Sequence, residues 1–203
     1  MSTQPVPPRR IGVFGGSFDP PHRGHTALAQ AAVTHLHLDL LLVVPTGSAW
    51  HKSRPLSAAQ HRLAMCALAF GDMPRARVDD CEIRRGGPSY TVDTLEALHQ
   101  AYPGAEFFLL MGQDQAQRLG TWSRAEALPQ LATLCVAARA GSDAQLPQQG
   151  LHVPMPAMPF SSSAIRAAVA AAGDTSTMLA PAVARYIAQH RLYATISPTE
   201  NPD

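Results

Sequence analysis

The chain has 203 residues, of which 46% are apolar and 15% charged, and its 16 basic and 15 acidic side chains leave a net charge of +1. This length and composition fit one well-buried domain, and the balanced charge argues against a dedicated nucleic-acid surface. No apolar run approaches the roughly 20 residues that a bilayer span requires. Residues 1–10 contain three prolines and no apolar core, so they do not resemble a signal peptide. We therefore predict a cytoplasmic protein without a nucleic-acid or membrane partner.

Three cysteines, Cys66, Cys81 and Cys135, are scattered singly through the chain, and no C-x-x-C motif is present. An odd, dispersed set is typical of buried thiols in a reducing compartment rather than of disulfides or zinc ligands. The composition along the chain predicts a flexible segment over residues 1–9, a single domain over 10–193 and a flexible tail over 194–203. We predict no metal site built from protein ligands.

The first expected element is a short apolar strand from residue 11, which runs into a glycine loop and then into a helix. The loop contains Gly15 and Gly16, and His22 and His25 lead into the helix. Glycines let backbone N–H groups approach an anion closely, and a helix start adds unpaired N–H donors and partial positive charge. The two histidines are three residues apart, so they share one helix face if both lie on the first helical turn. This stretch predicts a phosphate site, although it matches neither the P-loop nor the G-x-G-x-x-G pattern.

The rest of the chain alternates between helical and strand-like patterns. Short continuous apolar runs predict strands buried on both faces, and Ser57 with Gln60 and Ser123 with Glu126 have the spacing of capping boxes at helix starts. In chain order we expect a helix over 26–35, a strand over 39–44, a helix from 57 to 71, a strand over 77–83, a loop over 84–88, a helix from 89–91, a strand over 106–111, a helix start at 123–128, strands over 133–138 and 151–154, and helices from 161 and over 181–190. This order predicts an α/β fold, a Rossmann-like doubly wound parallel sheet with helices on both faces.

Candidate functional residues follow successive strands of the expected sheet. They are Gly15, the loop that contains residues 50–52, Gly112, Arg139 and Ser161. Ligands of open parallel sheets collect beyond the carboxyl ends of the strands, so these positions converge on one edge. Consecutive hydroxyls at Ser161, Ser162 and Ser163 can cap a helix and donate to phosphate oxygens, and Arg166 adds a two-pronged charge one turn later. A serine-capped helix with a surface arginine is the alternative interpretation.

The first motif resembles the signature of the nucleotidyltransferase superfamily, G-G-x-F-D-P-x-H-x-G-H, at every fixed position of residues 15–25. Residues 160–166 resemble the second signature of that superfamily, I-S-S-T-x-I-R, with Phe160 in place of the first residue and Ser163 in place of threonine. Further segments resemble bacterial nicotinate-nucleotide adenylyltransferases in identity and order: residues 88–95, 112–114, 121–122, 135–139 and 187–193. The resemblance covers residues 10–193 and implies transfer of AMP from ATP to nicotinate mononucleotide, which yields deamido-NAD and pyrophosphate.

The resemblance also implies roles for individual residues. His22 and His25 would donate to the α- and β-phosphates, and Arg166 with Ser162 would hold the leaving pyrophosphate. The rest of the ATP site would comprise Gly15, Gly16, Ser17, Phe18, Gly112, Asp114, Ser161 and Ser163. Trp122 would stack on the nicotinate ring, Tyr90 and Thr91 would receive its carboxylate, and Lys52 and Arg139 would approach the acceptor phosphate. Mg²⁺ would be carried by the ATP phosphates, because this ion keeps waters and needs few protein ligands. Asp19 is expected in a turn.

Several alternatives stay open at the level of the sequence. One is an adenylyltransferase of the same fold that prefers nicotinamide mononucleotide, accepts both mononucleotides or acts on phosphopantetheine. Another is a nucleotide-binding regulator without catalysis, although both histidines and Arg166 are present. A metal-binding module through His22 and His25 lacks further ligands at sensible spacing. Lys52 could be a solvated lysine and Trp122 a core residue. Both a monomer and a homo-oligomer are compatible with the sequence.

Overall fold

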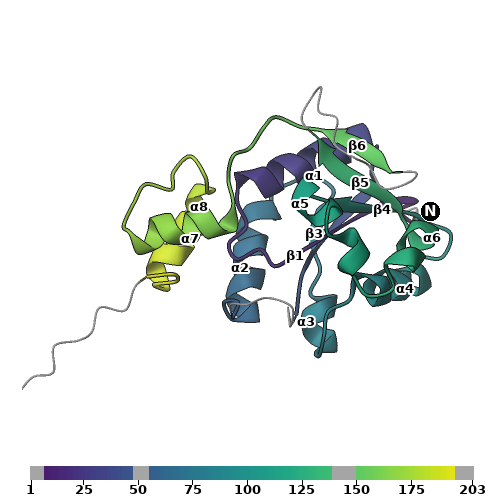
Figure 1. Cartoon of the computed structure of the whole chain (residues 1–203), viewed down its shortest axis with the longest axis horizontal. Helices are drawn as coiled ribbons and strands as arrows, with labels where there is room; N and C mark the ends of the chain where they lie inside the picture. The colour runs from purple at the N-terminus through teal and green to yellow at the C-terminus, as the bar shows by residue number, and fades with distance from the viewer. Residues whose placement is uncertain (1–6, 48–54, 139–149, 195–203) are drawn as a thin grey trace, which may run out of the picture.

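The computed structural model describes residues 7–47, 55–138 and 150–194. Its centre is a parallel six-stranded sheet in the order β3-β2-β1-β4-β5-β6, with helices on both faces (Figure 1). The strands are β1 (Arg10–Gly16), β2 (Leu40–Pro45), β3 (Ala76–Val78), β4 (Glu106–Met111), β5 (Thr133–Ala138) and β6 (Leu151–Pro154). The helices are α1 (Arg23–His35), α2 (Ala59–Phe70), α3 (Cys81–Arg85), α4 (Thr91–Ala101), α5 (Gln113–Ala116), α6 (Leu128–Leu131), α7 (Ser162–Ala170) and α8 (Pro181–Gln189). The predicted fold class is confirmed.

The central strands are apolar throughout because both faces of the sheet are covered. In β1, Phe14 joins a buried cluster with residues of α1 and α2, whereas Ile11 and Val13 join a second cluster with residues of α4 and α6 on the other face. Gly12 faces the first cluster, where a Cβ atom would come within 2.8 Å of the side chains of Leu38 and Leu41. The alternation along β1 therefore builds two cores, one on each side of the sheet.

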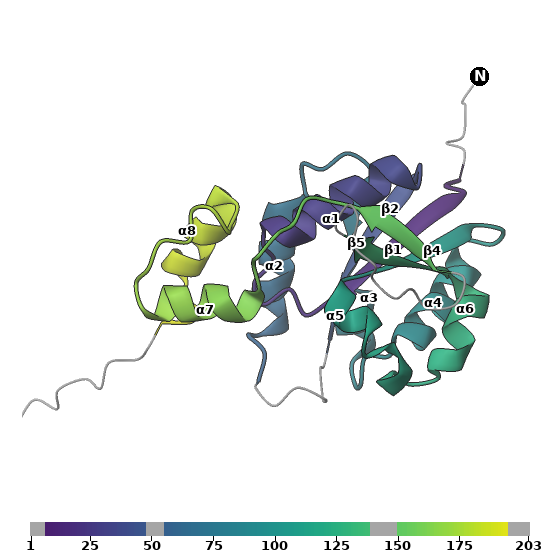
Figure 2. The same cartoon turned by 45° about the horizontal axis from the view of Figure 1, so that its top comes forward.

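A third cluster joins α7 and α8 to the rest of the molecule. Met65 of α2 packs with Ile165 of α7 and with Leu179, Val183 and Ile187 in and before α8, and all five are buried. Figures 1 and 2 show α7 and α8 together at one end of the molecule, on the side of α2. This packing brings the C-terminal helices close to the carboxyl end of β1. No helix among the described residues is long and apolar enough to span a membrane.

Several local predictions were wrong. The strand expected over 77–83 ends at Val78, and the Asp79 side chain accepts the N–H of Cys81 and helps the chain turn into α3. The expected capping box at Ser57 does not form, because the Ser57 N–H donates to Asp19 and α2 begins at Ala59. Neither does the one at Ser123, since Arg124 adopts φ 50° and a 3₁₀ turn over Ala125–Ala127 follows. The first helix begins at Arg23, three residues earlier than predicted.

Candidate active site

The predicted phosphate loop comprises the last two residues of β1, Gly15 and Gly16, and the turn that leads from there into α1. Built at Gly15, a Cβ atom would meet no atom within 4 Å, so this backbone faces open space. At Gly16 it would come within 3.0 Å of the ring of Phe18. A side chain at either position would therefore occupy the space above the loop or displace the ring below it. The loop keeps its backbone accessible to an anion.

His22 and His25 stack against each other at the start of α1. His22 is the N-cap residue, and His25 lies three residues on, with 3.7 Å between the two ring centroids. The backbone N–H of His22 donates to Nδ1 of His25 at 3.1 Å. Because Nδ1 accepts this bond, a neutral His25 carries its proton on Nε2. The local backbone thus fixes which nitrogen of His25 can donate to a substrate.

His22 lies in a more apolar environment than an exposed histidine. Burial lowers the pKa of its imidazole from 6.5 to about 4, so the ring is neutral at physiological pH. Its Nδ1 atom is buried and has no hydrogen-bond partner among the residues that the structure describes. A Cβ atom at Gly24 would lie 3.1 Å from this ring. The glycine between the two histidines therefore leaves room for the ring of His22.

Phe18 supports the histidines from below. Its side chain is 1% exposed and makes edge contacts with Phe14, Phe70 and His25, with centroid distances of 5.3, 5.8 and 5.1 Å. A side chain in this position cannot line an ATP site. The prediction that Phe18 contacts ATP can therefore hold only for its backbone, and the ring packs against His25 instead.

The second motif lies against the first, although the two are separated by most of the chain. Ser161 caps α7 by accepting the N–H of Ala164 at 3.1 Å, as predicted. Arg166 donates to the carbonyl of Asp19 at 2.7 Å and to the Ser163 hydroxyl at 3.0 Å. Ser162 Oγ donates to the carbonyl of Pro20 at 2.9 Å. The start of α7 is thus hydrogen-bonded to the backbone of the loop that precedes His22.

Residues predicted to bind the rest of the ligands lie at or beyond the carboxyl ends of the strands. Gly112 follows β4 as the N-cap of α5, and a Cβ atom there would lie 2.8 Å from Oδ1 of Asp114. Tyr90 is the N-cap of α4 and Thr91 its first residue. Tyr90 and Trp122 both pack, half-buried, against the core cluster of that face. Lys52 and Arg139 lie outside the described residues.

Sequence reasoning missed Arg62, which joins three loops beneath the site. Its side chain is 1% exposed, and its nitrogens donate to the carbonyls of Ser17, Gly47 and Ser57 at 2.9 to 3.2 Å. Burial lowers the pKa of this guanidinium, while the nearby Asp19 carboxylate opposes the shift. The only signal in the sequence is an arginine on the apolar face of α2, which is also compatible with an exposed position. Arg62 fixes the loop after β1 relative to the loop after β2.

Asp19 is buried and takes part in polar contacts of the loop, in agreement with its expected place in a turn. Its carboxylate accepts the Tyr193 hydroxyl at 2.6 Å and the Ser57 N–H at 3.3 Å. Among the described residues, no three His, Cys, Asp or Glu side chains are grouped so that they could hold a metal ion. The three cysteines are free thiols. Among the described residues, the carboxylate of Asp19 therefore binds hydrogen-bond donors and is not part of a group of side chains that could hold a metal ion.

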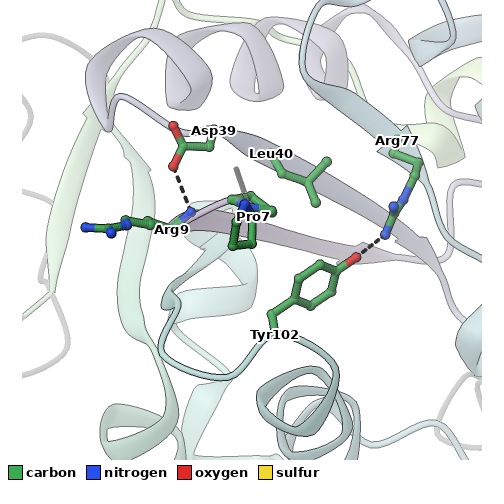
Figure 3. Close-up of a pocket in the computed structure, with 7 residues that line it drawn as sticks. Pro7, Arg9, Asp39, Leu40, Arg77 and Tyr102 are labelled. Atoms are coloured by element: carbon green, nitrogen blue, oxygen red, sulfur yellow. Dashed lines mark hydrogen bonds between the residues drawn. The ribbon is translucent and has the colours of Figure 1, made fainter. Parts of the chain in front are cut away.

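A separate pocket lies at the opposite end of the sheet, beside the amino ends of β1 and β2 (Figure 3). It has a volume of about 540 Å³ and is lined by Pro7, Pro8, Arg9, Asp39, Leu40, Arg77 and Tyr102. In this pocket the Arg9 N–H donates to Asp39, and Arg77 donates to the Tyr102 hydroxyl. Residues 7–9 precede β1 and residues 39–40 lie at the start of β2, while Arg77 lies in β3 and Tyr102 directly follows α4. The signature glycines lie instead at the carboxyl end of β1. The pocket is therefore distinct from the site at the carboxyl edge.

Comparison with known proteins places the chain in a family. The model of the cytidylyltransferase-like family matches residues 13–168. The chain is 51% identical over 196 residues to a probable nicotinate-nucleotide adenylyltransferase of Albidiferax ferrireducens (92% of this chain, 99% of the relative). It is 46% identical over 199 residues to one of Methylibium petroleiphilum (93% and 94%).

A solved structure has the same fold. It is the Plasmodium falciparum nicotinic acid mononucleotide adenylyltransferase complexed with NaAD, which is 20% identical to this chain. The TM-score is 0.78, and the match covers 91% of this chain and 97% of the other. At this identity the likeness is one of fold, whereas the sequence relatives are close over nearly their full length. The chain therefore belongs to the cytidylyltransferase-like family and, within it, to the bacterial nicotinate-nucleotide adenylyltransferases.

Proposed function

We propose that the protein transfers AMP from ATP to nicotinate mononucleotide and releases pyrophosphate, with deamido-NAD as the product, a step of NAD biosynthesis. The observation that carries this proposal is the contact between the two signature segments. The paired His22 and His25 and the start of α7 with Ser162 and Arg166 meet at the same loop. Donors from both segments can then act on one polyphosphate. The free thiols and the use of ATP are compatible with a cytoplasmic location.

The reaction is a single in-line displacement at the α-phosphorus. An oxygen of the mononucleotide phosphate forms the new bond, and the bond from the α-phosphorus to the oxygen that bridges to the β-phosphorus breaks. The electron pair of the broken bond leaves with pyrophosphate, and no covalent intermediate with the protein is needed. Such transfer depends on positioning and on stabilising charge rather than on a protein nucleophile. The preformed donors at the start of α1 supply this stabilisation.

The two histidines have different roles in this scheme. His25 offers the Nε2–H, because its Nδ1 already accepts from the backbone. It stabilises the charge that grows on the phosphate oxygens. His22 binds as a neutral ring, since burial lowers its pKa to about 4. Arg166 would keep its bond to the carbonyl of Asp19 and turn other N–H groups of its guanidinium to the β- and γ-phosphates. Ser162, now hydrogen-bonded to the carbonyl of Pro20, would exchange this partner for a phosphate oxygen.

We propose that Mg²⁺ enters with ATP. Mg²⁺ keeps several waters and coordinates substrate phosphates, so it fits a site whose described residues form no dedicated cluster of ligands. When bound, the ion neutralises phosphate charge. The residues of this chain would hold the phosphates through the glycine backbone at Gly15 and Gly16, the N-terminus of α1 and the donors of α7.

The acceptor would lie on the side of α4. The backbone N–H groups at the start of α4, after the N-cap Tyr90, offer a partial positive charge to the nicotinate carboxylate, and Thr91 adds a hydroxyl donor. Trp122 lies half-buried against the same core cluster as Tyr90 and would stack on the pyridine ring. Gly112 and Asp114 would meet the adenosine ribose. Lys52 and Arg139 would approach the acceptor phosphate.

The test is to incubate the protein with ATP, Mg²⁺ and one acceptor and to measure both pyrophosphate and the dinucleotide product. We expect one pyrophosphate for each deamido-NAD formed from nicotinate mononucleotide. His25→Ala should abolish most of this turnover, and His35→Ala, at the exposed end of the same helix, should not. Transfer to phosphopantetheine alone, or ATP binding without turnover, would contradict the proposal.

A further inference from the structure

Tyr193 reaches the first signature motif from the other end of the chain. It follows α8, and its hydroxyl donates to Oδ1 of Asp19 at 2.6 Å, across 174 positions of sequence. Its backbone adopts φ 65°, a left-handed conformation that is uncommon for a residue other than glycine. The surrounding structure therefore determines where this residue lies. The contact between Tyr193 and Asp19 is not part of the C-cap of α8, which is His190.

Asp19 is the point at which several elements meet. Its side chain is 1% exposed, and its carboxylate accepts Tyr193 from after α8 and the Ser57 N–H from before α2. Its carbonyl accepts Arg166 from α7. Asp19 lies three residues before His22, so its position sets where the chain enters α1. A shift of Asp19 would move the histidines and Arg166 relative to each other.

The hydroxyl of Tyr193 stays protonated and can therefore always donate its hydrogen bond. Burial and the adjacent Asp19 carboxylate raise its pKa above the ordinary value for tyrosine, so the phenol keeps its proton. A hydrogen bond to an ionised acceptor is about twice as strong as one between neutral groups. The buried Arg62 holds the neighbouring carbonyls of Ser17 and Ser57. Tyr193 thus holds the loop through the side chain of Asp19, and Arg62 holds it through the carbonyl of Ser17.

We propose that Tyr193 is a positioning residue for adenylyl transfer, which acts through Asp19 to align His22 and His25 with Arg166. This inference rests on the proposed function, because alignment is needed only if both signature segments act on the same phosphates. Tyr193 itself touches no reacting atom in this account. Its effect is therefore expected on the chemical step rather than on the binding of either substrate.

The test compares Tyr193→Phe with Tyr186→Phe as the matched control. Tyr186 lies on α8 and its hydroxyl is hydrogen-bonded to His61, away from Asp19. For Tyr193→Phe we expect kcat to fall about tenfold or more, because misplacements of about 1 Å can cost about a hundredfold in rate. KM for both substrates should stay within about twofold, and thermal unfolding should stay cooperative. Tyr186→Phe should keep the wild-type kcat.

Asp19→Asn changes the acceptor of the same hydrogen bond, and it replaces Tyr193→Phe as the test if Tyr193→Phe does not fold. If the two residues act as one unit, the double variant should be no slower than the slower single variant. Additive losses, a kcat within twofold of wild type in Tyr193→Phe, or an equal loss in Tyr186→Phe would overturn the inference. A loss of kcat explained by a smaller folded fraction would also overturn it. A wild-type protein that forms no deamido-NAD would instead refute the proposed function.

Discussion

Acidification should destabilise the protein through His22 in particular. The pKa of this ring is lowered from 6.5 to about 4 in the folded state, whereas the unfolded chain titrates near 6.5. Between these values the unfolded state binds more protons, so stability is present above pH 6.5 and is lost as pH falls towards 4. Integrated from pH 7 to pH 5, the difference amounts to about 2 kcal/mol, and the full shift corresponds to about 3 kcal/mol.

The assay is urea unfolding of wild type and His22→Gln, monitored by tryptophan fluorescence at pH 7, 6 and 5. The variant lacks the titrating ring, so subtracting its pH dependence removes the contributions of carboxylates and of the other histidines. We expect the wild-type free energy of unfolding to fall by about 2 kcal/mol more than that of the variant over this range. Parallel curves for the two proteins would show that the partly buried ring of His22 is not held in its neutral form by the fold.

Three further predictions follow from the site. His25→Ala should lower kcat by about 10²–10³ while the Kd for ATP changes little, since the lost donor meets charge that grows in the transition state. If ATP binding weakened by the same factor as kcat fell, His25 would not be a donor specific to the transition state. Arg62→Lys should lower the free energy of unfolding by about 2 kcal/mol or more, because one ammonium cannot reach three separate carbonyls. Arg84→Lys, at an exposed ion pair, is the control. An equal urea midpoint for Arg62→Lys and wild type would contradict this prediction. Elemental analysis of tag-free protein should find no stoichiometric zinc, because the described residues lack a three-ligand cluster, and about one zinc per chain would show a missed site.

The sheet was predictable because its signal is local. Runs such as residues 106–111 are apolar without interruption, which is the mark of a strand covered on both faces, and β4 has those bounds. The meeting of the two signature segments was also predictable in outline, because both follow strands of one parallel sheet. The prediction that residues 10–193 form a single domain, and those on location and oligomeric state, stay predictions.

The contacts that hold the site together could not be predicted. Tyr193 and Asp19 are 174 residues apart, and only the packing of α8 on α2 brings the hydroxyl to the carboxylate. Arg62 is indistinguishable by residue type from an exposed helical arginine. The capping pattern at Ser57 failed for the same reason, since the tertiary partner Asp19 takes the Ser57 N–H. Local patterns are overridden where a residue has a stronger partner elsewhere in the fold.

The preference for the acid over the amide substrate tests the proposed function most directly. The start of α4 at Thr91 offers N–H donors, which suit a carboxylate and leave donors unpaired opposite an amide, at about 1–3 kcal/mol each. Two such mismatches correspond to a preference of about a hundredfold. We therefore expect kcat/KM at saturating ATP and Mg²⁺ to be about a hundredfold higher for nicotinate than for nicotinamide mononucleotide, with Thr91→Val reducing the ratio without abolishing it. Equal values for the wild-type protein would contradict the account and indicate an enzyme of dual specificity.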